Sequence, residues 1–453
     1  MNNLDTMSIK NKTIEKILDF YLKSSDFNGI PLSTLAVKLN IEYIKLLSVI
    51  NELIEEEAVS VQDGENPHIV RWGHYDKETQ LNRVKEAEKN EVRIIHTINP
   101  VGFNEGITPI NITLDSHLLC AYPSPTYLKQ HYTDNKYDSL PFTKRLAYGE
   151  AQVKPAYFEI DVLERYFSDP RYHFDFEDYS GQISVVETLQ KPSLLRETDQ
   201  VFLKTFGLGY DESGNRVAVA YLRYLSDLSA EHQAYWNSKI ITTPCNMVNE
   251  YYQNTIIGSW VFSQSLFSAA IEEHRIANEM SQLITGKSIF RETFEGDKRP
   301  KEFTFFTSAT LVNYENFISL LDKMISDNIN KDFFKGVIEE YEMVPISDGV
   351  VERKSKGTLR LLEEWLRDNY HLKDETGYEK LMAPFKEVRK ERQKPAHKIS
   401  ENYYDKNFFK KQMDFLGKVY QSLSYLRLVF QKHPSCAAVE IPKWIQEGKI
   451  KNF

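Results

Sequence analysis

The chain has little cysteine, no long apolar run and no excess of positive charge. Its three cysteines, Cys120, Cys245 and Cys436, are isolated from one another, so they form no metal-type pair and suit a reducing compartment. No apolar stretch approaches the roughly 18 residues that a membrane helix needs. The N-terminal stretch MNNLDTMSIKNKTIEKILDFY has no apolar signal core. We therefore expect a cytoplasmic protein without a membrane segment.

Length and charge limit the molecule further. A chain of 453 residues, of which 41% are hydrophobic, exceeds one compact unit, so we expect two or three domains. The formal net charge of −9 excludes a chain that binds polyanions over its whole surface. Any contact with nucleic acid must therefore come from a local basic patch.

Residues 1–78 carry the pattern of a winged helix-turn-helix domain. Apolar residues at helical spacing predict helices over 11–25 and 41–58, and Pro31 opens a short helix between them. One side of the third helix carries Ile44, Leu47, Ile50, Leu53 and Ile54. The following stretch, 59–72, has two β-rich segments around a turn that contains glycine, asparagine and proline. Three helices and a hairpin together predict a winged helix.

The third helix of this domain is acidic. In many winged helices the third helix enters the major groove of DNA. Here it offers one cation, Lys45, against the glutamates Glu42, Glu52, Glu55, Glu56 and Glu57. Such a helix repels phosphates more than it attracts them. Binding of DNA and a structural or protein-binding role both remain open, and the charge favours the second.

Residues 79–304 predict a middle domain of mixed α and β structure. A highly charged stretch, 76–93, leads into it and has the composition of a linker helix or a surface connector. β-branched and aromatic residues with turn signals between them then predict strands within 92–103, 110–122, 156–167, 181–187 and 215–225.

Local signals in the middle domain fix some boundaries. Asp211, Gly214 and Asn215 predict the turn of a β-hairpin. One helix is expected to begin near Ser229, and another to end at Gly286. We expect most of the many tyrosines and tryptophans here to lie in the core, although base stacking or partner contact stays open for some of them.

Beyond residue 310 the pattern is helical only, so residues 305–453 predict an all-α bundle. In the last helix, apolar residues recur every three or four positions, at Phe409, Met413, Leu416, Tyr420, Leu423, Leu426 and Phe430. In an earlier helix Leu381, Phe385 and Val388 form the inward face. That helix ends in the stretch RKERQKPAH, 389–397.

The end of this helix is a candidate site. Arg392 follows Val388 by four residues, so its side chain starts on the inward side, where it needs an anionic partner or a cleft open to a ligand. In a straight helix Arg392 and His397 would lie roughly 140° apart. Pro395 breaks the helix, and this break can swing His397 back toward Arg392.

An arginine beside a histidine suits the cleavage of RNA by its own 2′-hydroxyl. The guanidinium offers a fixed fork for a phosphate, and the imidazole moves a proton near neutral pH. This chemistry requires no metal and no other cofactor. The cations expected to guide the RNA backbone are Lys386, Arg389, Lys390, Lys394 and Lys398.

An Arg-x4-His motif at the end of a helix in a C-terminal α-bundle resembles the HEPN superfamily. The resemblance covers roughly residues 305–435 and maps the motif onto Arg392 and His397, with Gln393 as its polar second position. It implies a metal-independent endoribonuclease of a prokaryotic antiphage-defence, abortive-infection or toxin system. Two bundles commonly share one composite site in this family, which implies a homodimer. An upstream acid often orients the motif, and Glu363 or Glu364 is the expected residue.

Combined with the resemblance, the sequence predicts a multidomain α+β protein: a winged helix, a mixed middle domain that senses a trigger or regulatory partner, and a HEPN-like bundle. Arg392 would bind the scissile phosphate of an RNA substrate, and His397 would be the acid or base. The alternative is a non-enzymatic regulator or scaffold that dimerises through its bundle. In that alternative the basic helix end is only a solvated terminus whose cations suit the helix dipole.

Two further clusters are weaker candidates. On a strand His173, Asp175 and Glu177 would share a face and can ligate a metal, although a turn-rich acidic surface or a protein-binding patch is the favoured interpretation. The stretch EEHRIANE, 272–279, lacks the order of a metalloprotease motif, and we expect a partly exposed helix face.

Overall fold

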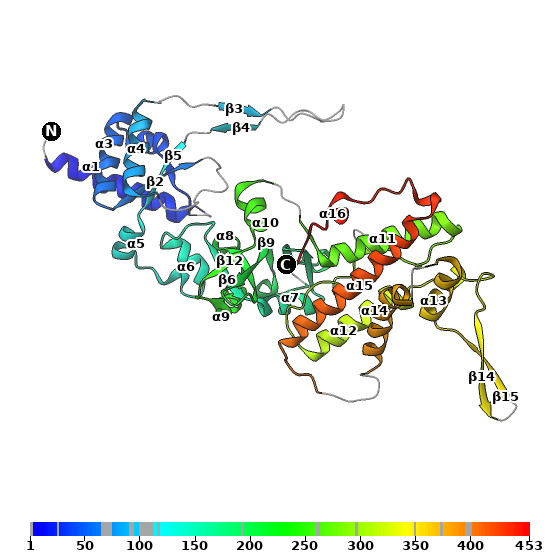
Figure 1. Ribbon diagram of the computed structural model, residues 1–453. Coiled ribbons are helices and arrows are strands. Elements are labelled where there is room, and N and C mark those ends of the chain that lie inside the picture. The colour runs from blue at the N-terminus through cyan, green and yellow to red at the C-terminus, as the bar shows by residue number, and fades with distance from the viewer. Residues whose placement is uncertain are drawn as a thin grey trace. The chain divides into compact units, whose positions relative to one another are not determined.

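Figure 1 shows a computed structural model of the protein, which is a multidomain α+β chain with several small sheets. The structure describes residues 3–24, 27–64, 75–89, 95–98, 112–115, 118–191, 194–259, 263–294, 298–347, 350–371, 375–394 and 401–453. The chain divides into two compact units. The first comprises Met1–Val162, Arg171–His173 and Gln182–Met247, and the second comprises Leu163–Pro170, Phe174–Gly181 and Val248–Phe453. Every helix within the described residues is too short or too polar to cross a lipid bilayer.

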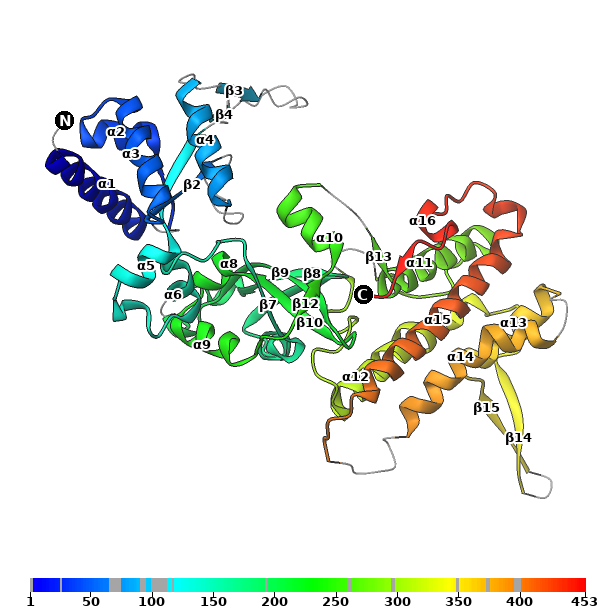
Figure 2. The same ribbon diagram turned by 60° about the vertical axis from the view of Figure 1, so that its left-hand side comes forward.

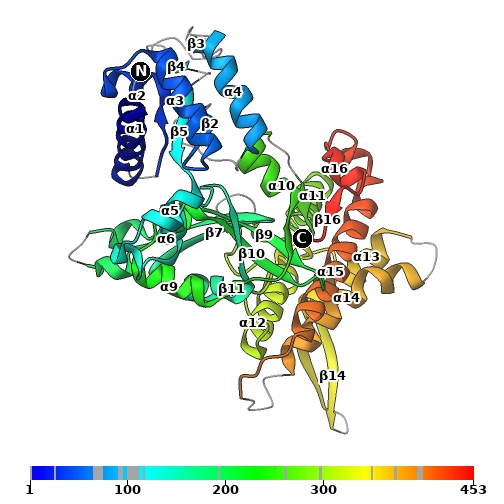
Figure 3. The same ribbon diagram turned by 90° about the vertical axis from the view of Figure 1, so that its left-hand side faces the viewer.

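The chain begins with the three expected helices, α1 (Asn3–Lys23), α2 (Leu32–Leu39) and α3 (Tyr43–Glu55). They lie beside a three-stranded sheet in the order β1 (Ile30–Pro31), β5 (Leu118–Pro123) and β2 (Val59–Gly64) (Figure 3). Most of the predicted inward face of α3 is buried, together with Leu46. Ile44 is the exception, because it lies in the first turn of α3 and is 56% exposed. The second predicted strand of the hairpin falls mostly on residues 65–72, outside the described residues.

The charged stretch expected to be a connector is helix α4 (Lys77–Lys89), and it belongs to the core of this region. Val84 is fully buried, and Leu81 packs against the same apolar cluster as Ile50 and Leu53 of α3. The stretch is therefore a helix, as the first alternative predicted, and its apolar side chains attach it to the core, so the alternative of a surface connector was wrong.

The largest sheet in the described part of the chain has seven strands, and most of their residues belong to the first unit. Its path is β11-β6-β10-β9-β8-β7, and β12 pairs with β9. The strands are β6 (Pro155–Glu159), β7 (Tyr172–Glu177), β8 (Ser180–Val185), β9 (Phe202–Asp211), β10 (Arg216–Tyr221), β11 (Ile240–Ile241) and β12 (Cys245–Met247). A separate two-stranded sheet joins β3 (Ile95–Ile98) to β4 (Ile112–Asp115).

The predicted hairpin turn between β9 and β10 is confirmed. The carboxylate of Asp211 accepts hydrogen bonds from the backbone N–H groups of Ser213 and Asn215, at 2.9 and 2.8 Å. Gly214 has a φ of 78°, a left-handed conformation that glycine adopts without strain. Two hydrogen bonds within the turn and the conformation of Gly214 therefore close it through residues that are neighbours in the chain.

The first unit also contains several short helices. They are α5 (Pro125–His131), α6 (Pro141–Ala147), α8 (Leu222–Ser226) and α9 (Ala230–Ser238). The expected start of a helix near Ser229 is confirmed, because the Ser229 side chain accepts a hydrogen bond from the backbone of His232 at the start of α9.

The second unit is built mainly from five helices: α11 (Leu266–Thr285), α12 (Leu311–Asp322), α13 (Thr358–Asn369), α14 (Glu375–Gln393) and α15 (Asn407–Gln431). It also contains α7 (Glu164–Ser168), α10 (Asn249–Tyr252) and α16 (Lys443–Gln446), and a parallel pair of β13 (Gln264–Ser265) and β16 (Ile450–Lys451). The inward face predicted for α14 is confirmed, since Leu381, Phe385 and Val388 are buried. Helix α11 ends at Gly286 as expected.

Helix α11 packs along α15 (Figure 2), and the unit that contains both also includes Leu163–Pro170 and Phe174–Gly181. The domain boundary expected at residue 305 stays a prediction. One expectation for this region was wrong, because the bundle is not all-α. An antiparallel hairpin of β14 (Tyr341–Ser347) and β15 (Val350–Ser355) leads into α13, and most of its residues are exposed. Because the side chains on both faces of this hairpin are exposed, its strands lack the alternation of apolar and polar residues from which a strand is predicted.

A buried ion pair joins α11 to α15. The Nε atom of Arg427 lies 2.5 Å from Oε2 of Glu273, and both side chains are almost completely buried. His274, the next residue, is also buried and stacks on Phe290 with ring centroids 3.9 Å apart. The stretch 272–279 is partly exposed, as expected, because Glu272, Arg275 and Asn278 are half-buried and Glu279 is exposed, whereas Glu273 and His274 are packed inside.

Candidate functional site

Arg392 faces inward in the last turn of α14, as its spacing from Val388 predicts, and it binds two aspartates. Its Nη1 atom lies 2.6 Å from Oδ2 of Asp322 and 2.6 Å from Oδ2 of Asp327. Arg389, one turn earlier, binds the same two carboxylates through Nε, at 2.9 Å from Asp322, and Nη2, at 2.7 Å from Asp327. We call these four residues the Arg–Asp cluster.

A π-helical turn brings the two aspartates together. Residues five positions apart in an α-helix lie roughly 140° apart around its axis. After α12 the chain forms a π turn over Lys323–Asp327, in which hydrogen bonds join residues five apart. Asp322 and Asp327 therefore lie on one side of the helix and meet both arginines of α14. Asp322 has no exposed side-chain surface, whereas that of Asp327 is 43% exposed.

The Arg–Asp cluster pairs two guanidinium groups with two carboxylates. Hydrogen bonds to Asp322 and then Asp327 raise the pKa of Arg392 above its usual value. Partial burial opposes ionisation of Asp327, but the hydrogen bonds and charges of Arg392 and Arg389 outweigh it and lower its pKa. The two aspartates thus hold the arginines in place and compensate their charge.

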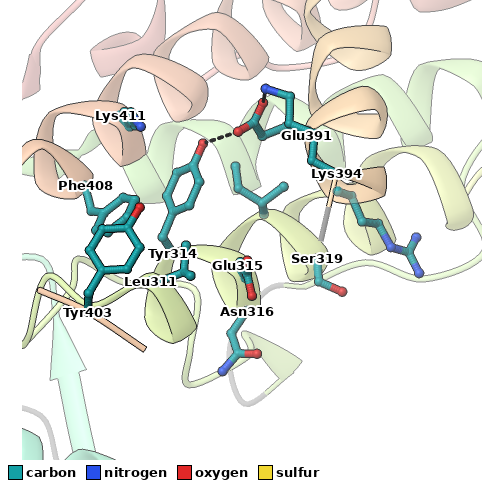
Figure 4. Close-up of a pocket in the computed structure, with 12 residues that line it drawn as sticks. Leu311, Tyr314, Glu315, Asn316, Ser319, Glu391, Lys394, Tyr403, Phe408 and Lys411 are labelled. Atoms are coloured by element: carbon teal, nitrogen blue, oxygen red, sulfur yellow. Dashed lines mark hydrogen bonds and ion pairs between the residues drawn. The ribbon is translucent and has the colours of Figure 1, made fainter. Parts of the chain in front are cut away.

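A pocket of about 480 Å³ opens beside Arg392, between α12, the end of α14 and the start of α15. Figure 4 shows this pocket, which we call the α14 pocket. Its charged lining consists of three cations, Arg392, Lys394 and Lys411, and two acids, Glu315 and Glu391. Leu311 and Ile318 supply apolar surface, and Asn316 and Ser319 supply polar groups.

Aromatic rings form one side of the α14 pocket. The rings of Tyr314 and Phe408 are stacked, with centroids 4.9 Å apart, and the Tyr403 ring lies 5.6 Å from Phe408. The ammonium group of Lys411 lies 5.2 Å from the centre of the Phe408 ring. The Tyr314 hydroxyl donates to Oε1 of Glu391 at 3.2 Å (Figure 4). Burial, followed by the charge of Glu391, raises the pKa of Tyr314, so this tyrosine stays protonated.

Comparison with family models, with curated proteins and with solved structures gave no match. The chemistry of the site is therefore argued from its geometry.

The carboxylates that hold Arg392 are not those expected from the sequence. Glu363 binds Lys386 at 2.6 Å and Arg367 at 3.4 Å. Glu364 binds Lys356 at 2.6 Å and Arg360 at 3.0 Å. Helix α13, which carries both glutamates, is joined to α14 by the ion pair of Glu363 with Lys386. The prediction that one of them pairs with Arg392 was wrong, and Asp322 and Asp327 take that place.

The other predicted residues lie in different settings. Lys394 lines the α14 pocket and forms an ion pair with Glu391, whereas Lys386 and Arg389 form the ion pairs given above. Lys390 and Gln393 are exposed. Pro395, His397 and Lys398 lie outside the described residues, so the expected approach of His397 to Arg392 stays a prediction.

The alternative metal cluster gains no support. In the part of the chain that the structure describes, no group of three or more histidine, cysteine, aspartate or glutamate side chains is placed to hold a metal ion. His173 and Glu177 are exposed on strand β7.

Sequence reasoning missed Asp322, Asp327, Tyr403, Phe408 and Lys411 as parts of this site. One signal was present: Asp322 directly follows Ile318 and Leu321 on the buried face of α12. A carboxylate on an apolar face requires a buried cationic partner. The aromatic residues gave no comparable signal, because aromatic residues at helical spacing are common in cores.

Proposed function

We propose that the protein is a metal-independent endoribonuclease that cleaves RNA at the α14 pocket. One observation carries the proposal: the guanidinium of Arg392 is fixed by Asp322 in the wall of a pocket that also has two lysines and a cluster of aromatic rings. A fixed guanidinium recognises a phosphate, and aromatic rings recognise bases.

Arg392 keeps hydrogen-bonding capacity for a ligand. Both aspartates bind its Nη1 atom. Among the described residues no acceptor is hydrogen-bonded to its Nε or Nη2 atom. These remaining N–H groups match the geometry with which arginine grips two phosphate oxygens. Arg392 would therefore bind the scissile phosphate and stabilise the charge that develops on it.

The proposed reaction uses the 2′-hydroxyl of the RNA as nucleophile. A base removes the 2′-hydroxyl proton, the O2′–P bond forms, and the P–O5′ bond breaks as the 5′-oxygen takes up a proton. The products are a 2′,3′-cyclic phosphate and a free 5′-hydroxyl. His397, which follows the pocket residue Lys394 by three positions, is the proposed proton carrier.

The resemblance to the HEPN superfamily stays part of this proposal. An upstream acid that orients the motif arginine is expected in that family, and Asp322 supports the proposal by holding Arg392 in this way. A homodimer with two motifs at one composite site, regulation by a trigger, and a defence or toxin setting rest on the resemblance alone. A cytoplasmic location agrees with RNA as substrate and with three free cysteines.

The test is an RNA cleavage assay with and without EDTA, on the wild type and on Arg392→Ala, His397→Ala and Arg389→Ala. Arg389 binds the same aspartates but does not line the α14 pocket, so Arg389→Ala reports what loss of ion pairs alone does. We expect cleavage that EDTA leaves unchanged, that Arg392→Ala and His397→Ala abolish, and that Arg389→Ala reduces far less. Cleavage that requires a metal, or equal losses in both arginine variants, would refute the proposed mechanism.

A non-enzymatic scaffold is the second candidate, and one contact favours it. Asp327 already forms an ion pair with Arg392, as a phosphate oxygen of bound RNA would. If the cluster is only structural, the wild type will not cleave RNA, and Arg392→Ala will change unfolding but not RNA binding.

The winged-helix assignment of the N-terminal helices also stays a proposal. Lys10 of α1 binds Glu52 and Glu56, and Lys77 of α4 binds Glu55. The acidic end of α3 is thus engaged within its own domain, which supports a structural or protein-binding role. A gel shift with duplex DNA over a salt series tests the alternative of a non-enzymatic, DNA-binding regulator. Tight binding that weakens steeply with salt would favour DNA recognition.

A further inference from the structure

The Tyr403 ring is an exposed aromatic surface inside the α14 pocket. It is 53% exposed and lies at the edge of the cluster that contains Phe408 and Tyr314 (Figure 4). We propose that this side of the pocket is a nucleobase subsite, in which one unpaired base stacks on Tyr403. The inference rests on the proposed function for its substrate class, and it adds that the substrate must be single-stranded at this nucleotide.

Hydrogen bonds fix the backbone around Tyr403, so the place of its ring is set before a ligand binds. The Tyr403 carbonyl accepts a hydrogen bond from the N–H of Leu311 at 2.9 Å, and the Asn402 side chain accepts one from Val312 at 3.1 Å. The N–H of Asp405 donates to the carbonyl of Ala309 at 2.9 Å. An exposed ring on an anchored segment loses little freedom when a ligand binds, which favours affinity.

The ring behind Tyr403 is itself supported. Phe408 is buried and stacked on Tyr314, whose hydroxyl is held by Glu391. Tyr403 therefore rests on a rigid aromatic layer, as a base-stacking residue requires. The ammonium group of Lys411, near the same rings, is placed to attract the phosphate of a nucleotide whose base lies on Tyr403.

The size and charge of the pocket fit one nucleotide. Its volume of about 480 Å³ is typical of pockets that bind a small organic molecule. Asn316 and Ser319 offer the donors and acceptors that read the edge of an unpaired base. Three cations against two acids in the lining suit one or two phosphates, and they do not suit a long basic track along a duplex.

A base that is paired in a duplex cannot enter such a pocket, because its edge is occupied and its faces are covered by its neighbours. The subsite therefore predicts a preference for single-stranded RNA. It also predicts a weak salt dependence: with one or two phosphates neutralised, log K should fall with log salt at a slope between about −0.7 and −1.4.

The experiment measures binding separately from cleavage. A short single-stranded RNA carries 2-aminopurine, whose fluorescence falls when it stacks, and a 2′-deoxy group at that nucleotide prevents cleavage there. Titration uses the full-length wild type, Tyr403→Ala, Tyr403→Phe and Tyr404→Ala. Tyr404 is the matched control, since it is the neighbouring tyrosine, is 58% exposed and does not line the pocket. The same strand in a duplex is the second probe.

We expect quenching by the wild type, about tenfold weaker binding with Tyr403→Ala because one stacking contact is lost, and near-wild-type binding with Tyr403→Phe and Tyr404→Ala. The duplex should bind at least tenfold more weakly than the single strand. Equal effects of Tyr403→Ala and Tyr404→Ala, equal binding of duplex and single strand, or no binding of RNA would each overturn the subsite. Tyr403-dependent quenching in a protein that cleaves no RNA would keep the subsite and refute the nuclease.

Discussion

The Nη1 atom of Arg392 lies 2.6 Å from Oδ2 of Asp322, a carboxylate with no exposed side-chain surface. Arg389 binds the other oxygen of the same carboxylate. The partners differ in their access to water, because each arginine side chain is 31% exposed. Two half-buried cations therefore compensate one fully buried anion, and loss of the cations should cost more than loss of the anion.

This asymmetry gives the first prediction. The double variant Arg389→Ala with Arg392→Ala strands the Asp322 charge and should destabilise the packing of α12 on α14 by about 3–5 kcal/mol. Asp322→Asn leaves the arginines partly solvated and should cost less, about 1–3 kcal/mol. Hydrogen exchange of the α12 and α14 amides measures both values locally, which suits a chain of several domains. An equal or larger loss in Asp322→Asn would contradict the argument.

The second prediction concerns Asp327, which competes for Arg392 with any phosphate. Asp327→Asn removes a half-exposed negative charge and should strengthen binding of single-stranded RNA by about twofold to fivefold, since such a charge is worth up to about 1 kcal/mol. The control is Asp332→Asn, which removes the same charge at an exposed position outside the Arg–Asp cluster. RNA affinity from fluorescence titration should rise only in Asp327→Asn. The same change in both variants would indicate a general effect of net charge.

The third prediction is a pH dependence of stability set by His274 in α11. Burial lowers the pKa of His274 to about 3, well below the value of about 6.5 expected in the unfolded chain. Between these values the unfolded state takes up a proton that the folded state does not. Above pH 6.5 His274 is neutral in both states and does not lower the free energy of unfolding. As the pH falls below 6.5, the free energy of unfolding decreases by roughly 1.4 kcal/mol per pH unit.

The measurement compares thermal unfolding at pH 7 and pH 5 for the wild type, His274→Gln and His131→Gln. His131 is an exposed histidine of α5, so its replacement controls for the loss of one titrating side chain. The fall in melting temperature between the two pH values should be smaller in His274→Gln than in the wild type or His131→Gln. A fall of the same size in all three proteins would show that His274 does not set this dependence.

Much of the local structure followed from the sequence because it depends on neighbours in the chain. The turn at Asp211, Gly214 and Asn215 and the end of α11 at Gly286 are fixed by a carboxylate, by short-range hydrogen bonds and by left-handed glycines. The buried face of α14 followed from helical spacing, which places Leu381, Phe385 and Val388 on one side.

Expectations failed where contacts between distant residues outweighed the local pattern, or where a segment had no apolar period. Helix α4 has the composition of a connector, yet Val84 and Leu81 pack it against the core of its region. Hairpin β14–β15 has no apolar period, although the dipeptide Asp348-Gly349 between its strands is typical of hairpin loops. The packing of α11 along α15, which includes the ion pair of Glu273 with Arg427, joins residues far apart in the chain.

The sequence by itself determined that Arg392 starts on the inward side of its helix, because 3.6 residues per turn place it below Val388. It also required that the inward-facing Arg392 meet an anion or a ligand, because moving an unpaired charge away from water raises the free energy of the folded state. Only the tertiary structure decided which anion this is. A π turn at the end of α12 and the packing of α12 on α14 bring Asp322 and Asp327 to Arg392, and the same packing opens the pocket beside it.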